Sequence, residues 1–205
     1  MSDFINTIDQ LGDEVVLVSI LDRSITEFKD NVLTSIRDNA FRDCTNLTTI
    51  DLPNVITVGE NAFRTCRNLT TINLPNLTSI GGEYAFAYTN LTTIKLPNVT
   101  GTLVNNIFSN CTNLAMVEFC KNVTFNYGVF SNSPNIKALI LRSDTLCKDT
   151  SGCSLTTNCY IYVPRALVES YKTDHRWSKY ADKIRALEDY TVDGTTTGAL
   201  DETKV

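Results

Sequence analysis

Residues 40–53 read AFRDCTNLTTIDLP, and close copies of this segment return at intervals of 22 or 23 residues. The period is marked by five phenylalanines, Phe41, Phe63, Phe86, Phe108 and Phe130. A unit of this length holds one short strand and cannot bury its own apolar face, so each unit must lie on its neighbours. We therefore predict an α/β solenoid of about five coils, built from short stacked parallel strands.

The segment Thr49 to Pro53 shows how one coil is built. Alternation predicts a short strand with Ile50 and Leu52 inward, and with Thr49 and Asp51 facing solvent. The strand should end at Pro53, because proline cannot donate a hydrogen bond to a continuing ladder. Strands in such a stack lie about 4.8 Å apart, so each position in the repeat becomes a row along the solenoid axis.

Three of these rows are predicted to be structural. The phenylalanines should form a stacked spine. A second apolar row should fill the core and comprises Ile50, Ile72, Ile94, Val117 and Leu139. The third row should satisfy turn backbone groups with its amides and comprises Asn46, Asn68, Asn90, Asn113 and Asn135. Three of these asparagines begin Asn-x-Thr, but we favour the structural role over glycan attachment because the first residues carry no ordinary export signal.

The outward strand positions are the candidate binding residues. They are Thr49, Asp51, Thr71, Asn73, Thr93, Lys95, Met116, Glu118, Ala138 and Ile140. If these positions simply face solvent, the threonines are explained because β-branched residues suit strands. Met116 and Ile140 are explained less well in this way. Because solenoids commonly bind through extended surfaces, a contact surface is the alternative interpretation of these rows.

Net charge and hydropathy narrow the classes of partner that this chain is expected to bind. The net charge is −5 and the pI is about 4.9, which disfavours nucleic acid because phosphate binding needs clustered Lys and Arg. The apolar run from Val15 to Leu21 is too short to span a bilayer, so no membrane partner is expected. This run is either an extra strand of the sheet or a docking segment, in which case a homo-oligomer is possible.

The polar residues give no sign of an enzyme. Cys44, Cys66 and Cys111 each follow a repeat phenylalanine by three residues, so we interpret them as reduced core thiols. The later cysteines lack the close spacing of a zinc site, and we expect no metal and no cofactor. His175 is the single histidine and has no nucleophile or acid in a recognisable motif, so we predict no catalytic residue.

We divide the chain into four segments. Residues 1–35 form an N-terminal segment with a degenerate capping half-repeat, and residues 36–145 form the repeat solenoid. Residues 146–187 form a C-terminal cap, with a strand at 160–163 and a helix whose apolar face includes Trp177, Tyr180, Ile184 and Leu187. Residues 188–205 form a polar tail, either flexible or a strand that orders on a partner.

The units from Ile36 to Leu141 resemble the BspA-like, or Treponema-type, leucine-rich repeats, and the stretch from Tyr160 to Ile184 looks like the cap that often ends such arrays. The resemblance implies a leucine-rich repeat fold and a non-enzymatic protein. Most members are surface adhesins that bind proteins or glycans. The segment from Ala186 to Gly194 resembles the endings of repeat proteins that phages and prophages of gut Firmicutes encode.

The resemblance and the residues lead to one expected function and one alternative. We expect a phage virion appendage, assembled in the bacterial cytoplasm, where reduced cysteines and a missing export signal are both ordinary. Its partners would be other virion proteins, or a protein or glycan of the host surface. The alternative is a bacterial cell-surface adhesin.

Overall fold

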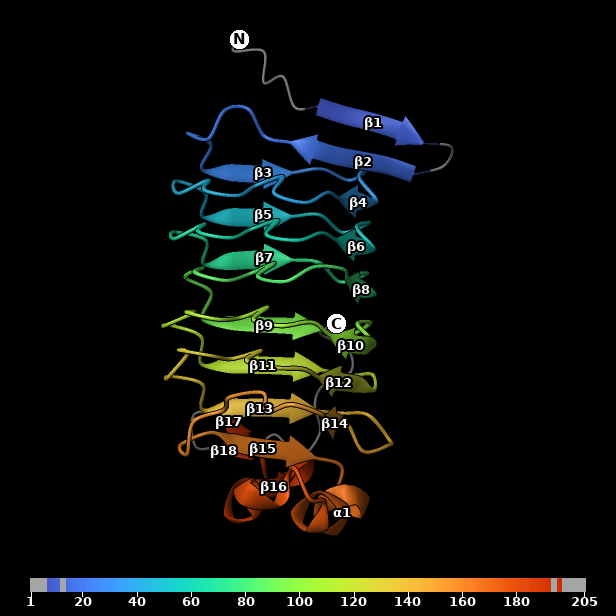
Figure 1. Ribbon diagram of the computed structural model, residues 1–205, viewed down its shortest axis with the longest axis vertical. Helices are drawn as coiled ribbons and strands as arrows, with labels where there is room; N and C mark the ends of the chain where they lie inside the picture. Colours follow the sequence, from blue (N-terminus) through green and yellow to red (C-terminus); the bar gives the residue numbers. More distant parts are fainter. Residues whose placement is uncertain (1–6, 12–13, 193–194, 197–205) are drawn as a thin grey trace.

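The computed structural model describes residues 7–11, 14–192 and 195–196, and it confirms the solenoid. Figure 1 shows an elongated stack of short strands with the N-terminal hairpin at one end and the C-terminal helices at the other. The start of the N-terminal segment and most of the polar tail lie outside the described residues. Among the described residues, no helix has the length and apolar character needed to cross a bilayer.

One side of the stack, which we call the strand face, carries the strands predicted from the repeat. Its two sheets have the orders β3-β5-β7 and β9-β11-β13-β15-β16. The strands are β3 (Glu27–Lys29), β5 (Thr49–Asp51), β7 (Thr71–Asn73), β9 (Thr93–Leu96), β11 (Met116–Phe119), β13 (Ala138–Leu141), β15 (Tyr160–Val163) and β16 (Ile184–Ala186). All are parallel, and equivalent residues pair, as Thr49 does with Thr71.

A second side holds shorter strands. They are β2 (Glu14–Ser19), β4 (Ser35–Ile36), β6 (Thr57–Val58), β8 (Ser79–Ile80), β10 (Gly101–Leu103), β12 (Val123–Phe125) and β14 (Lys148–Asp149). At the N-terminal end, β1 (Thr7–Leu11) runs antiparallel to β2, and β2 is parallel to β4. The apolar run from Val15 to Leu21 is thus largely an extra strand of the sheet, with Val16 and Leu17 buried.

Backbone stacking extends past both ends of the repeat motif. The solenoid has about eight turns, more than the five coils that the motif predicts. Glu27 pairs with Thr49 in the N-terminal half-repeat, and Tyr160 pairs with Ala138 after the motif has ended. The divisions at residues 35 and 145 therefore mark changes of sequence motif, whereas the strand ladders continue across them.

The predicted phenylalanine spine is confirmed. Successive rings from Phe41 to Phe130 are stacked, with centroids 5.0 to 6.0 Å apart and interplanar angles of 8° to 12°. Phe28 closes the N-terminal end edge-on at 5.0 Å. All five rings are fully buried, so the spine supplies a large share of the apolar burial that holds the coils together.

Two left-handed backbone positions recur in each coil, two residues before and two residues after the phenylalanine. The first set is Asn39, Asn61, Tyr84, Asn106 and Gly128, and the second is Asp43, Thr65, Tyr88, Asn110 and Asn132. Asn, Asp and Gly adopt positive φ at low cost, which explains their frequency here. The conformation turns the chain sharply enough for the phenylalanine N–H to reach the next coil, as Phe41 N–H does to Ala62 O at 2.8 Å.

The strand ladders on both sides break between the second and third phenylalanine repeats. Strands β7 and β9 belong to different sheets, as do β8 and β10. One extra residue precedes Phe86, and it falls in a turn that passes very close to the preceding coil. A Cβ added to Gly82 would lie 2.2 Å from the Cα of Glu60, so this approach requires glycine.

The asparagine row differs from the prediction. Asn46 and Asn68 are exposed, whereas Asn113 donates to the side chain of Asn90 and Asn135 donates to Thr112 O. A regular ladder forms instead at the asparagine after the strand proline. Asn54, Asn76 and Asn98 donate to Asn31 O, Pro53 O and Pro75 O at 2.7, 2.9 and 2.8 Å. These turns need the amide because their carbonyls have no strand partner.

The cap begins after β15 with a 3-10 turn, η1 (Arg165–Leu167), followed by α1 (Val168–Thr173) and a second 3-10 segment, η2 (Ser178–Lys183). The predicted long helix is wrong beyond Lys183, because Ile184 starts β16 and pairs with Ile161. Trp177 is fully buried, meets Phe125 edge-on at 5.7 Å, and donates its indole N–H to Cys147 O at 2.7 Å.

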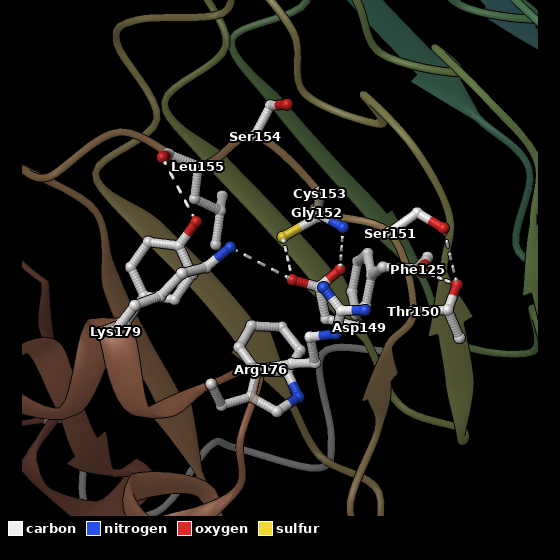
Figure 2. A network of polar contacts seen from close by, with 12 residues as sticks. Phe125, Asp149, Thr150, Ser151, Gly152, Cys153, Ser154, Leu155, Arg176 and Lys179 are labelled. Atoms are coloured by element: carbon white, nitrogen blue, oxygen red, sulfur yellow. Dashed lines mark hydrogen bonds and ion pairs between the residues drawn. The ribbon is translucent and has the colours of Figure 1, made fainter.

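A buried carboxylate joins the cap to the last coil. Figure 2 shows Asp149 between the Gly152–Cys153 loop and Lys179 of the cap. Its oxygens accept the Gly152 N–H at 2.9 Å and lie 3.7 Å from Lys179 Nζ and from Cys153 Sγ. Because buried polar groups need partners, this arrangement fixes the loop and the cap together.

Candidate binding surface

The first six candidate residues form two open rows on the strand face. Thr49, Thr71 and Thr93 occupy one row, and Asp51, Asn73 and Lys95 occupy the other. All six side chains are exposed or half-exposed. Asn73 Nδ2 donates to Asp51 Oδ1 at 2.7 Å, which links neighbouring coils. We call these six residues the open strand face.

The other four candidate residues are not exposed as expected. Met116 is half-buried, and the exposed fractions of Glu118, Ala138 and Ile140 are 6%, 6% and 1%. Their positions still point away from the core, because Met116 pairs with Thr93, and Glu118 pairs with Lys95. Another part of the chain must therefore cover them.

Part of the cover is the C-terminal strap, which we define as residues 187–192. It comprises the 3-10 turn η3 (Leu187–Asp189), Tyr190 and β17 (Thr191–Val192), and β17 pairs with β18 (Thr195–Thr196). Tyr190 Oη lies 3.4 Å from Met116 Sδ, and the Tyr190 ring meets Tyr162 at 4.7 Å. The strap thus contacts this end of the strand face at Met116 and Tyr162.

A charged cluster lies under the strap. Glu118 forms an ion pair with Arg142 and lies 4.0 Å from Lys95 Nζ. Burial, and to a smaller extent the negative charge of Glu118, raise the pKa of Tyr190. Burial also raises the pKa of Tyr162, and the neighbouring Tyr190 adds to it. Both phenols therefore remain neutral and able to donate hydrogen bonds at physiological pH.

A shallow groove on the proline–asparagine flank was missed by sequence reasoning. It has a volume of about 580 Å³ and is lined by Val32, Thr34, Asn54, Ile56, Asn76, Thr78 and Asn98. Val32 and Ile56 are exposed apolar side chains among uncharged polar ones. The signal for it was the recurring Leu-Pro-Asn triplet, which sets one asparagine per coil along this edge.

The remaining candidate residues are the cysteines, most of which are part of the core, and His175, which lies on the surface. The seven cysteines are free thiols, and in the described residues Cys120 alone among them is not buried. Burial raises the pKa of Cys153 and of Cys159 to about 12, which keeps these thiols protonated. Within the described ranges, His, Cys, Asp and Glu form no group of three that could hold a metal ion. His175 is exposed on the cap, 3.8 Å from Asp174.

Comparison with known families gives one match. The sequence profile described as "BspA type Leucine rich repeat region" matches residues 34–150 in 6 copies. The matched part is more than half of the chain. No curated protein is similar enough to match.

Several solved structures match this chain. A leucine-rich repeat protein from Bacteroides ovatus has 22% identity and a TM-score of 0.42 over 78% of this chain and 55% of its own. The T. pallidum leucine-rich repeat protein has 18% identity and a TM-score of 0.47 over 90% and 97%. A leucine-rich cell surface protein from Faecalibacterium prausnitzii has 14% identity and a TM-score of 0.48 over 88% and 54%. The chain thus spans about half the length of the Bacteroides and Faecalibacterium proteins.

Proposed function

We propose that this chain, which belongs to the BspA-type leucine-rich repeat family, is a non-enzymatic module that binds another protein through its open strand face. Leucine-rich repeat proteins generally mediate protein–protein interaction through extended surfaces of this kind. The observation that carries the proposal is the contrast along the strand face. Coils at Thr49, Thr71 and Thr93 present their outward residues to solvent, whereas the outward residues of the next two coils are half-buried or buried.

The chemistry of the open strand face supports a polar protein partner. Its threonines form a row of β-branched side chains, which is a stable platform in a parallel stack. Beside it, Asp51, Asn73 and Lys95 place a negative, a neutral and a positive group at successive coils. Such a pattern favours a partner with complementary charges, since electrostatic complementarity gives specificity more than affinity.

Cross-linking from single positions tests this surface. A photoreactive amino acid is placed at Thr71 or Thr93, with Thr102 as the control because it is an exposed strand threonine in β10 on the other side. We expect adducts to one identified partner protein from the first two positions and not from Thr102. Equal adducts from all three positions, or none from Thr71 and Thr93, would remove this face from consideration.

At a finer level, we propose a virion appendage that contacts neighbouring virion proteins, or a protein or glycan of the host surface. This placement is supported by the resemblance of residues 186–194 to the endings of phage-encoded repeat proteins. The second candidate is a bacterial cell-surface adhesin. It is supported by the resemblance to BspA-type proteins, most of which are surface adhesins. Mass spectrometry of purified particles and of the bacterial surface fraction separates the two, because the chain would be enriched in one and absent from the other.

A further inference from the structure

The strap covers a surface whose chemistry differs from the rest of the strand face. In register under it are Glu118, Ile140 and Tyr162, whereas the same row in the earlier coils holds Asp51, Asn73 and Lys95. Met116 and Ala138 continue the neighbouring row. This area is therefore mostly apolar and aromatic with one partly buried ion pair, which is the composition of an interface core.

The Tyr190 side chain packs against Tyr162 and Met116, and we call the site that these two residues form the socket. The Tyr190 ring stands edge-on to Tyr162, at 4.7 Å and 69°, and its hydroxyl reaches Met116 Sδ at 3.4 Å. Edge-to-face pairing favours an aromatic ring at this point, and the thioether sulfur is a weak acceptor for its hydroxyl. Burial, and to a smaller extent the nearby charge of Glu118, raise the pKa of the phenol.

The rim of the socket is basic although the chain as a whole is acidic. Arg165 Nη2 lies 3.1 Å from Asp189 and 3.7 Å from Glu188, so one guanidinium forms ion pairs with both acidic residues of the strap. Lys183 and Arg185 lie over the ring of Tyr160, at 5.1 and 5.2 Å. The local charge thus favours an acidic segment that enters with an aromatic residue.

One donor under the strap is left without an acceptor. Arg142 gives its Nε–H to Glu118, but its Nη2 is buried and has no hydrogen-bond partner within the described part of the chain. A buried, unpaired guanidinium N–H costs free energy. The strap therefore fills the socket without satisfying it, and a ligand with an additional carbonyl or carboxylate there would bind better.

The charged contacts of the strap are weak. Its ion pairs to Arg165 are exposed, with side-chain exposed fractions of 62% for Arg165 and 53% for Asp189, and such pairs contribute little. Strands β17 and β18 form a sheet of their own, separate from the five-stranded sheet of the strand face. Elements with exposed polar contacts and small interfaces open at low free energy.

We propose that this end of the strand face is a binding site for an extended acidic segment of a partner protein that carries an aromatic residue, and that Glu188–Asp189–Tyr190 fills the site in cis. Tyr162 and Met116 receive the aromatic ring, Arg165 receives the acids, and Arg142 Nη2 receives an acceptor that the strap does not supply. This site adjoins the open strand face at Thr93 and Lys95, but different residues form it, so either surface can fail its test without the other.

The test uses a labelled peptide with the sequence of residues 186–192 and two full-length proteins, the wild type and Tyr190→Ala. Loss of Tyr190 empties the socket, while the wild-type strap competes at the high effective concentration of a tethered ligand. We expect fluorescence polarisation to show binding at least about tenfold tighter to Tyr190→Ala than to the wild type. A peptide with alanine in place of the tyrosine should not bind.

Two controls make the result decisive. Arg165→Glu, added to Tyr190→Ala, should weaken peptide binding by reversing the charge at the rim, whereas Arg67→Glu, an exposed change elsewhere on the solenoid, should not. Unchanged unfolding midpoints would show that all variants fold. Absence of binding to folded Tyr190→Ala up to millimolar peptide, equal binding of the peptide without tyrosine, or insensitivity to Arg165→Glu would each overturn the proposal.

Discussion

Phe63 and Phe86 stack with centroids 5.4 Å apart and an interplanar angle of 8°, although the strands that follow them, β7 and β9, belong to different sheets. The aromatic spine is thus continuous where the strand ladder is broken. Turn-side hydrogen bonds cross the same point, since Phe63 N–H donates to Ala85 O at 2.8 Å. Packing and turn contacts, more than strand pairing, hold the two halves of the solenoid together here.

Removing the phenylalanine ring at this junction should therefore destabilise the fold severely. We expect Phe86→Ala to lower the free energy of unfolding by about 3–5 kcal/mol, because it leaves a cavity in the centre of the spine. Urea unfolding followed by circular dichroism measures the change. Tyr127→Ala is the matched control, since Tyr127 is an exposed aromatic residue of the same solenoid. An equal loss for the two variants would contradict a stabilising spine.

The period of 22 or 23 residues was sufficient to predict the spine and the strand register, because both depend on local spacing that every coil repeats. The stacking beyond residue 145 was not predictable in this way. Tyr160 occupies the position of Ala138 with no trace of the phenylalanine motif, so only the backbone carries the continuity. The cap was mistaken for a longer helix because Trp177, Tyr180 and Ile184 have helical spacing, whereas Ile184 pairs in a strand.

The candidate surface was predictable in its positions and not in its accessibility. Alternation identified the outward residues, and the open strand face has the exposure expected of it. Met116 and Ile140 carried a signal that an outward position is covered, but nothing in the sequence identified a short polar strap as the cover. The contact between Tyr190 and Met116 joins residues 74 apart, and such separations have no periodic signature.

The ladder at the proline–asparagine turns should contribute measurably to stability. We expect Asn76→Ala to cost about 0.5–1.5 kcal/mol, because the Pro53 carbonyl loses its amide donor. Asn68→Ala, at the row first expected to bond the backbone, should stay within about 0.5 kcal/mol of the wild type. Thermal unfolding of both variants distinguishes the two rows, and the reverse order would restore the original assignment.

The buried thiols make stability fall in alkali. Burial raises the pKa of Cys153 and of Cys159 from 9.0 to about 12 in the folded chain, whereas the unfolded thiols titrate near 9.0. As the pH rises above 9, the unfolded state loses protons that the folded state keeps, so the free energy of unfolding decreases. Each such proton is worth about 1.4 kcal/mol per pH unit.

Urea titrations at pH 8, 9 and 10 test this dependence. Stability should be flat between pH 8 and the onset of thiol ionisation and should then decline. Cys159→Ala should decline less steeply than the wild type, because one of the coupled protons is gone. A pH-independent free energy of unfolding up to pH 10 would show that the thiols are not held protonated by burial.

The attachment of the cap depends on Asp149, whose carboxylate contacts three groups from two elements. Asp149→Ala leaves the Gly152 N–H without its acceptor in a buried site, and we expect a loss of about 1–3 kcal/mol. Asp149→Asn keeps an oxygen for Gly152 but removes the charge opposite Lys179, so its loss should be smaller. Asp144→Ala, an exposed acid of the same coil, is the control for charge alone.

Tryptophan fluorescence reports the cap directly, because Trp177 packs on Phe125 of that coil. An emission shift is expected for Asp149→Ala but not for Asp144→Ala. If both variants unfold together and leave the emission unchanged, the carboxylate does not hold the cap.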